Sequence, residues 1–264
     1  MRTRYRKILV TAALTALALT AIFATAANAA TPAPPYQDFA GCPTRAENPF
    51  VAECIKFTFS GGQIGVGNRE VPVTSPIVLR GGTEQITGNF IDNAEGGIVP
   101  VKQTVPGGLI GLTGLKGLDE TIASKEQLKL YATVELAGNP GSLSKPTLSL
   151  PIKIHLQNPL LGSNCYVGSA ASPINLNLAV TKEVGELEFE AGREEVLATT
   201  APGTYSDSSY AVPGATGCQL TIGSFHLAID QLVDAAYDLP SAAGHNATTL
   251  DYGFAVVDPS VVYP

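Results

Sequence analysis

The chain has 264 residues, of which 45% are hydrophobic and 15% are charged, a composition typical of a globular protein. Its formal net charge is −7, and it becomes −11 once the four basic residues in the first seven positions are set aside. A chain with this negative charge repels the phosphate backbones of nucleic acids and anionic lipids. Nucleic-acid binding and attachment to an anionic membrane surface are therefore disfavoured.

The N terminus has the pattern of a secretory signal peptide. Basic residues at the start are followed by the uncharged run Ile8–Phe23 and then by the small residues Ala27 and Ala29. The alternative, a membrane anchor, would need about 20 strongly apolar residues, whereas this run is shorter and contains threonines. We expect a signal peptide over 1–29 and a secreted, extracellular protein that begins with a flexible lead-in, 30–36. We expect no transmembrane segment after signal removal.

Four cysteines follow this segment: Cys42, Cys54, Cys165 and Cys218. Disulfides persist in exported proteins, and four cysteines allow three pairings that sequence alone does not distinguish. We prefer Cys42–Cys54 and Cys165–Cys218, because this pairing joins neighbours within each half of the chain. A metal site made of four thiolates is the alternative, but the chain has no CxxC spacing. Within the loop that a Cys165–Cys218 disulfide would close, we expect 201–209 to be a loose segment.

Alternation with a period of two dominates the rest of the chain. Apolar and polar residues alternate over 128–136, 148–157, 174–180 and 250–256, as in strands with one buried face. Weaker strands are predicted at Ile55–Phe59, Gln63–Gly67, Ile77–Arg80, Glu186–Phe189 and Gln219–Ile222. Turns are predicted at Gly61-Gly62, Gly81-Gly82, Gly96-Gly97 and Asn139–Gly141.

Short strands with glycine-rich turns predict a mainly β chain with an antiparallel β-sandwich-like fold. This region covers 37–264, either as one domain or as two closely packed halves that divide near 158–162. One short helix is predicted at 231–237, with Asp230 as its N-cap and Pro240 after its end.

A leucine and glycine repeat at Leu109–Leu118 places a leucine at every third position. This period fits a 3₁₀ or extended segment better than an α-helix. We favour a loop that closes one end of the core. The alternative is an exposed apolar lip that inserts into a partner or a lipid surface.

Histidines are the first candidates for catalysis, and there are three: His155, His226 and His245. They are far apart in sequence, and neither G-x-S-x-G nor His-Glu-x-x-His occurs. We expect His155 to be exposed on a strand, His226 to be packed or to cap the helix, and His245 to lie in a loop. We assign no catalytic, cofactor-binding or metal-binding residue, and we expect the histidines to be dispensable.

Two acidic groups are the other candidates. Three aspartates at i, i+4 and i+8 of the predicted helix could hold a hard cation: Asp230, Asp234 and Asp238. Four glutamates crowd one strand and its approach, and paired carboxylates serve glycoside hydrolysis: Glu183, Glu186, Glu188 and Glu190. We interpret both groups as solvated faces. The chain lacks tryptophan, so aromatic platforms for sugars are poorly represented.

Several blocks resemble uncharacterised secreted proteins of actinobacteria. The most specific is Asn164-Cys-Tyr-Val-Gly-Ser169, and Pro213-Gly-Ala-Thr-Gly-Cys218 and Leu239–Ala247 follow in the same order. The resemblance covers most of the chain after the signal and is strongest from about Lys102 onward. It implies export and both Cys165 and Cys218, and it supplies no activity. His245 stands where the resemblance predicts a second asparagine, which weakens a catalytic role for this histidine.

These observations predict a secreted, disulfide-stabilised β-protein with a binding or structural role at or outside the cell envelope. Its extracellular or envelope partner is not identified by the sequence, and no cofactor is predicted. The alternative is an extracellular hydrolase with a carboxylate- or His-centred site. A third interpretation, a pore subunit with amphipathic strands, fits the cysteine cross-links less well than a packed core does. A cleft in which carboxylates or histidines converge would favour the hydrolase.

Overall fold

A computed structural model describes residues 30–111, 128–143, 147–222 and 224–264. The expected signal peptide and most of the leucine and glycine repeat lie outside these ranges. Leu109 lies inside them, on the one-turn helix α1 (Gly108–Gly111), and its side chain packs against the core. Across the described residues, no helix is both long and apolar enough to span a membrane.

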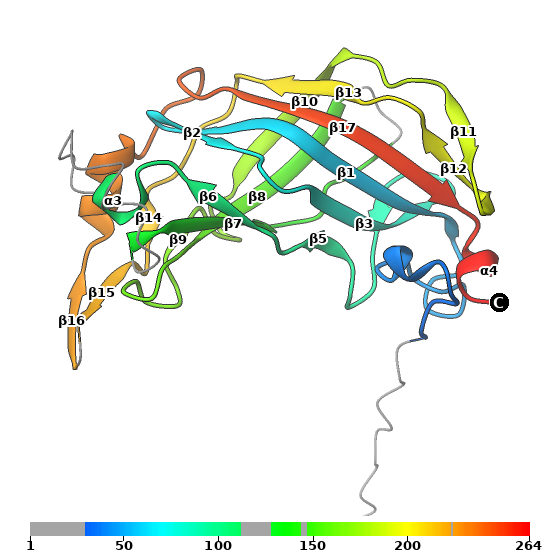
Figure 1. Cartoon of the computed structure of the whole chain (residues 1–264), viewed down its shortest axis with the longest axis horizontal. Helices are drawn as coiled ribbons and strands as arrows, with labels where there is room; N and C mark the ends of the chain where they lie inside the picture. The colour runs from blue at the N-terminus through cyan, green and yellow to red at the C-terminus, as the bar shows by residue number, and fades with distance from the viewer. Residues whose placement is uncertain (1–29, 112–127, 144–146, 223) are drawn as a thin grey trace, which may run out of the picture.

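Strands make up most of the described chain (Figure 1). The first half contains β1 (Val51–Val66), β2 (Arg69–Pro72), β3 (Ile77–Glu84), β4 (Phe90–Ile91), β5 (Gly97–Val99), β6 (Lys102–Val105), β7 (Leu130–Leu136) and β8 (Thr147–Gln157). The second half contains β9 (Tyr166–Val167), β10 (Ile174–Lys182), β11 (Leu187–Glu190), β12 (Arg193–Thr199), β13 (Gly203–Asp207), β14 (Ala215–Thr216), β15 (Gln219–Ile222), β16 (Phe225–Ala228) and β17 (Thr248–Val257). Within the described residues, fifteen strands form one sheet, while β15 and β16 form a separate hairpin.

The large sheet is antiparallel and folds over on itself. Its central order is β8-β10-β13-β17-β1-β3, with β7 and then β6 continuing beyond β8. The two ends of this order face each other, because β5 contacts β7 and β2 contacts β6. The sandwich-like antiparallel fold predicted from the sequence is confirmed. The sheet is continuous across the proposed division near 158–162. The strand β8, which precedes this division, pairs with β10, which follows it.

One buried glutamine joins the two ends of the sheet. Gln103 on β6 is 1% exposed. Its carbonyl oxygen accepts hydrogen bonds from the backbone of Thr74 and Ser75 at 2.9 and 3.0 Å, and its amide donates to the Ser75 carbonyl at 2.8 Å. Since the amide oxygen and nitrogen both have partners, burying this side chain leaves no polar group unsatisfied.

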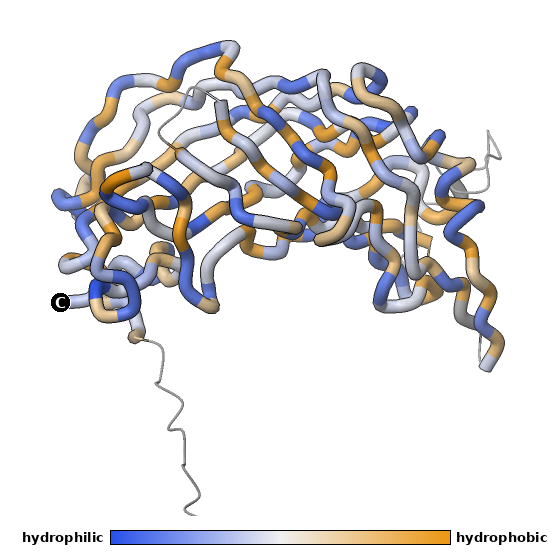
Figure 2. The backbone as a smooth tube through the Cα atoms, turned by 180° about the vertical axis from the view of Figure 1, so that it is seen from behind, coloured by the Kyte–Doolittle hydropathy of each residue, from blue (hydrophilic) through white to orange (hydrophobic). Residues whose placement is uncertain are grey.

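Alternation along the strands forms the core. The apolar residues of β8 and β10 face inward and are at most 3% exposed: Leu148, Leu150, Ile152, Ile154, Leu156, Ile174, Leu176 and Leu178. Figure 2 shows the same alternation of hydrophilic and hydrophobic positions along the chain. Each such side chain contributes about 1.5–3 kcal/mol through burial, so this face keeps the register of the strands fixed.

Two of the four predicted glycine turns are wrong. Gly61-Gly62 lies inside β1, at a bulge in its pairing with β17, and Gly81-Gly82 lies inside β3. Gly81 is needed for packing, because a Cβ there would lie 2.5 Å from the Phe90 ring. A glycine pair in the sequence thus marks a bulge or a close contact as readily as a turn.

The expectation of a loose segment over 201–209 is also wrong. Residues Gly203–Asp207 form β13, which pairs with β10 on one side and with β17 on the other. Its sequence contains glycine, serine and aspartate, which disguise a strand that is central in the sheet. Tyr205 is 5% exposed on its inner face.

A second, smaller core covers the outer face of β1 and β17. The N-terminal segment brings Phe39 and Cys42 onto this face, and α4 (Pro259–Val262) covers it from the other end of the chain. The Cys42–Cys54 disulfide ties the segment to β1. The segment expected to be a flexible lead-in is held at Ala33, whose backbone N–H donates to the Val262 carbonyl at 2.8 Å.

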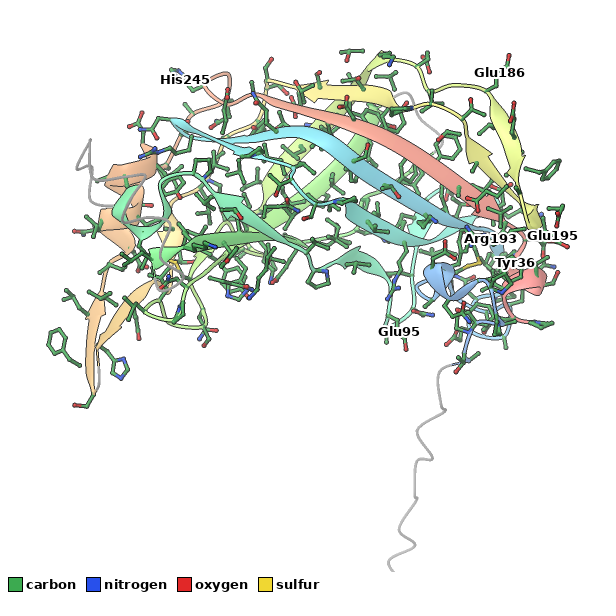
Figure 3. All side chains as sticks on the ribbon, viewed as in Figure 1. Tyr36, Glu95, Glu186, Arg193, Glu195 and His245 are labelled. Atoms are coloured by element: carbon green, nitrogen blue, oxygen red, sulfur yellow. A yellow bond between two sulfur atoms is a disulfide. The ribbon has the colours of Figure 1, made fainter. Side chains whose placement is uncertain are left out.

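Ion pairs also attach the N-terminal segment to the sheet. Asp38 forms ion pairs with Lys56 on β1 and, at 2.7 Å, with Arg193 on β12. Burial opposes ionisation of Asp38, but hydrogen bonds from Arg193 and Lys56 outweigh it and lower the pKa of this carboxyl. In Figure 3 Tyr36, Arg193 and Glu195 lie together beside α4, and the Tyr36 hydroxyl donates to Glu195 at 2.8 Å.

The predicted helix is present as α3 (Asp230–Tyr237), but Asp230 does not cap it. Asp230 is the first helical residue, and its carboxylate accepts from the backbone N–H of Cys218 at 2.6 Å. Asp234 accepts from Ala215 N–H at 2.6 Å. The helix therefore uses its carboxylates to hold the loop that carries Cys218.

The β15–β16 hairpin projects from the body of the protein beside α3 (Figure 1). All four side chains of β16 are exposed, including Phe225 and Leu227. His226 belongs to this strand, so its expected packed or capping position is wrong.

The structure contains the preferred disulfides, Cys42–Cys54 and Cys165–Cys218, with Cα atoms 5.2 and 4.0 Å apart. They close loops with sequence separations of 12 and 53 residues. We predict that serine replacement of both Cys165 and Cys218 lowers the free energy of unfolding by about 4 kcal/mol, against about 3 kcal/mol for Cys42 and Cys54.

Urea unfolding of the two double-serine variants checks this order of stability. Equal losses from the two bridges would contradict the dependence on loop length.

Burial of tyrosines predicts a loss of stability at alkaline pH. Burial raises the pKa of Tyr237 from 10.0 to about 12. The folded protein keeps this phenol proton where the unfolded chain has lost it, so the free energy of unfolding falls as pH rises through this interval. We expect Tyr237→Phe to reduce that loss by up to about 2 kcal/mol, measured by urea unfolding at about pH 9 and about pH 12. An unchanged difference between the two pH values would contradict this role of Tyr237.

Candidate binding pocket on the outer face of β6, β7 and β8

The three histidines do not converge. His155 lies on β8, His226 on the projecting hairpin and His245 in the exposed loop before β17. Figure 3 places His245 and Glu186 at opposite ends of the long axis of the molecule. His245 and Glu186 therefore do not form a shared His-carboxylate centre.

The aspartates of α3 are occupied by structural hydrogen bonds. Asp230 and Asp234 bind the backbone of the 214–218 loop, and Asp238 adopts the left-handed conformation that ends the helix, with φ of 57°. Within the described ranges, no group of three or more His, Cys, Asp or Glu side chains is arranged to hold a metal ion.

Glu188 and Glu190 lie on β11 of the exposed β11–β12 hairpin, and Glu183 and Glu186 lie in the segment that leads to it from β10. Glu183, Glu186 and Glu188 are exposed, and Glu190 is bound by Arg193 Nε at 2.8 Å. Leu187 and Phe189, on the opposite face of β11, are also 45% and 66% exposed. Both faces of this strand are therefore open to solvent, and Glu190 is half-buried against a guanidinium that also binds Asp38.

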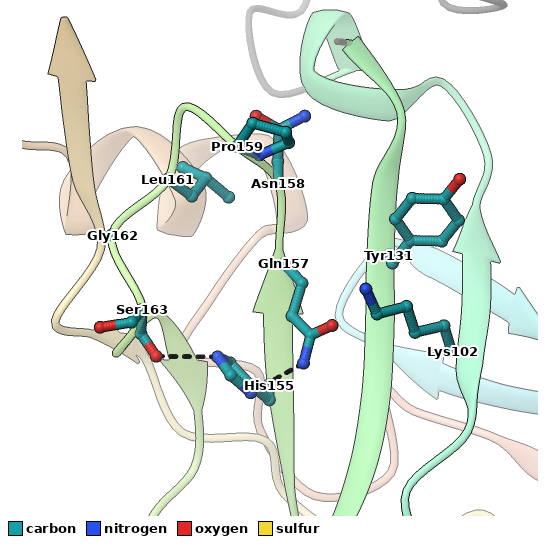
Figure 4. Close-up of a pocket in the computed structure, with 9 residues that line it drawn as sticks. All are labelled: Lys102, Tyr131, His155, Gln157, Asn158, Pro159, Leu161, Gly162 and Ser163. Atoms are coloured by element: carbon teal, nitrogen blue, oxygen red, sulfur yellow. Dashed lines mark hydrogen bonds between the residues drawn. The ribbon is translucent and has the colours of Figure 1, made fainter. Parts of the chain in front are cut away.

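A pocket of about 610 Å³ lies on the outer face of β6, β7 and β8 (Figure 4). Lys102 on β6 and Tyr131 on β7 form one side, and His155 and Gln157 on β8 form the other. The loop 158–163 closes its end. Among the described lining residues, Lys102 carries a formal charge at pH 7, and its ammonium lies 5.5 Å from the centre of the Tyr131 ring.

Hydrogen bonds hold the ring of His155 in place. Its Nε2 lies 2.9 Å from the Ser163 carbonyl oxygen, which can only accept, so Nε2 donates. Its Nδ1 lies 3.1 Å from the Gln157 amide nitrogen and 3.4 Å from a carboxylate oxygen of Glu135. Because both ring nitrogens have partners, His155 positions the loop.

Neighbouring side chains hold the histidine ring in place. His155 stacks on Tyr166, with ring centres 4.4 Å apart. The ammonium of Lys153 lies over the same Tyr166 ring, 4.7 Å from its centre. Glu135 on β7 forms an ion pair with Lys153 at 3.0 Å. The His155 side chain is 16% exposed, so the expectation of an exposed histidine is wrong: the loop before Cys165 covers it.

The wall of the pocket is tied to the disulfide. Leu156 N–H donates to the Cys165 carbonyl at 2.8 Å, and Gly162 N–H donates to the Gln219 carbonyl at 2.8 Å. Asn158, 8% exposed, donates to the Lys129 carbonyl and accepts from Leu160 N–H. The Cys165–Cys218 bridge and these hydrogen bonds thus hold the wall in place.

The sequence alone does not combine these residues into a site. Tyr131 and His155 both stand at polar positions of alternating strands, which was the available signal. Only the register of β7 and β8, which pairs Tyr131 with Gln157 and Thr133 with His155, brings them to one surface.

Comparisons with known proteins add no family to this description. No protein-family model matches the chain, and searches of curated proteins and of solved structures gave no match either.

Asn246, the residue after the exposed His245, joins several loops through its buried side chain. Asn246 is 2% exposed; its side-chain oxygen accepts from Gly67 N–H at 2.9 Å, and its nitrogen donates to the carbonyls of Tyr210 and Ala242 at 3.1 Å each. Three chain segments therefore depend on one amide.

We predict that Asn246→Ala lowers the free energy of unfolding by about 2–3 kcal/mol, because it leaves buried backbone groups unpaired. His245→Ala is the matched control and should change it by less than about 0.5 kcal/mol. Thermal and urea unfolding of both variants would measure this. A larger loss for His245→Ala would reverse the assignment.

Proposed function

We propose that this chain is a secreted binding protein that acts at or outside the cell envelope. We further propose that the pocket on β6, β7 and β8 binds a hydroxylated or acidic unit of an envelope polymer. The observation that carries the proposal is the pocket itself, where one cation and one aromatic face stand opposite hydrogen-bonding side chains on a wall held by hydrogen bonds.

The chemistry of the pocket supports this ligand class. Tyr131 offers a ring face against which a sugar ring can pack. Lys102 attracts carboxylate or phosphate groups, which a net-acidic chain otherwise repels. The Gln157 amide adds a group that hydrogen-bonds hydroxyls.

The proposal favours binding over hydrolysis. Hydrolysis needs a base or a pair of carboxylates at the ligand. Here the histidine uses both nitrogens for structure, and none of the described residues that line the pocket is an aspartate or glutamate.

Sedimentation of the protein, residues 30–264, with cell-envelope fractions and with soluble fragments released from them tests the proposal. We expect Tyr131→Ala to weaken binding about tenfold and Lys102→Ala to weaken it and reduce its salt dependence. Lys182→Ala, which removes an exposed lysine outside the pocket, is the matched control and should bind as the unchanged protein does.

Two results would contradict the proposal. One is binding that survives both pocket substitutions in folded protein. The other is release of shortened fragments during incubation, which would establish hydrolysis.

A further inference from the structure

A second hollow lies on the inner side of the folded sheet, away from the pocket described above. It has a volume of about 640 Å³ and is lined by β1, β3, β10, β13 and β17 together with the loop residues Gly88, Leu143, Glu183 and Val184. This size is within the range of small-molecule sites, which are mostly apolar with a few placed polar groups.

Aromatic rings form its wall. Phe57 on β1 pairs across the strands with Phe254 on β17, with ring centres 5.5 Å apart. Tyr252, two residues along β17, stacks on Tyr205 of β13 at 3.9 Å. Since residues two apart on a strand share a face, the register of β1, β17 and β13 places all four rings on the same side.

The wall is open to solvent at one end. Phe57, Tyr205 and Tyr252 are buried, but Phe254 and Val184, which line the same hollow, are only half-buried. Water in contact with these apolar side chains costs free energy that an apolar ligand would recover by displacing it.

Polar groups at the hollow carry one sign of charge. Glu53 and Glu183 line it and are exposed. None of the described residues that line it is a lysine, arginine or histidine. The hollow therefore repels anions and favours a cation at its opening.

Glu183 lies close enough to affect both tyrosines. The pKa of Tyr205 is raised mainly by burial and to a smaller extent by Tyr252 and the negative charge of Glu183. Burial, followed by Glu183, raises the pKa of Tyr252. Both hydroxyls are therefore neutral at pH 7, and a hydrogen bond links them. Glu183 is thus a carboxylate that acts on both tyrosine hydroxyls of the aromatic wall.

We propose that this hollow binds a small, largely apolar molecule that carries one amine. The apolar part would lie against Phe57 and Phe254 and displace water from them. The ammonium would lie at the opening, attracted by Glu183 and Glu53 and by the electron-rich faces of the aromatic rings. An acidic apolar molecule of the same shape, such as a fatty acid, would be rejected by the two carboxylates.

Three probes that differ only in their polar group test the proposal: decylamine, decanol and decanoate. Isothermal titration of each into the protein, residues 30–264, at neutral pH measures its affinity. We expect decylamine to bind at least about tenfold more tightly than decanoate, with decanol between them.

Two substitutions separate the roles of charge and of volume. Glu183→Gln should reduce the preference for decylamine over decanol about threefold. Glu186→Gln makes the same chemical change at an exposed residue that does not line the hollow, so the preference should not change. Val184→Phe fills the hollow and should weaken all three probes.

Several results would overturn the inference. They are failure of every probe to bind, decanoate binding as tightly as decylamine, or an equal effect of Glu183→Gln and Glu186→Gln. Unaltered binding to folded Val184→Phe would also overturn it. If Val184→Phe does not fold, as judged by thermal melting, the glutamate pair still decides. The hollow and the outer pocket are separate, so the test of one does not depend on the other.

Discussion

The pairing of β1 with β17 is the constraint on which the rest of the fold depends. These strands come from opposite ends of the chain and pair along most of their length, from Cys54 with Val257 to Ile64 with Thr248. The strand β17 also pairs with β13 and β12, and β1 also pairs with β2 and β3. Both faces of this pair are covered, the inner one by the main core and the outer one by the N-terminal segment and α4. A slip of one residue would exchange the two faces, so burial on both sides fixes the register.

Both candidate sites follow from register. The inner hollow exists because β1 and β17 place Phe57 beside Phe254, while β13 places Tyr205 beside Tyr252. The outer pocket exists because β7 and β8 place Tyr131 opposite Gln157. Each site combines side chains from strands that pair directly, and strands hold side chains more precisely than loops do. The chain thus presents polar groups on one side of its sheet and aromatic groups on the other.

Buried and half-buried polar side chains join segments that are far apart in the sequence. Gln103 joins β6 to the turn before β3, Asn246 joins three loops, and the aspartates of α3 hold the segment of Cys218. Each has protein partners for its polar atoms, so burial costs little and removal costs more than one hydrogen bond. In the sequence these residues look like ordinary loop or helix positions. Of the motifs that looked chemical, His155 lines the outer pocket and Glu183 lines the inner hollow. The other histidines and glutamates are either exposed or bound in structural ion pairs.

The sequence by itself determined the strands with alternating faces, the position of the helix and the preference for pairing cysteines within each half. Those features depend on neighbours along the chain, since period two and helix-ending residues are local signals. Tertiary structure alone decided that Gly61-Gly62 and Gly81-Gly82 lie within strands, that β13 is a central strand and that Asp230 binds Cys218 rather than capping α3. It also decided which polar residues share the pocket and which rings share the hollow. Each of these depends on contacts between strands far apart in sequence, and no local pattern encodes which strand becomes the neighbour of which.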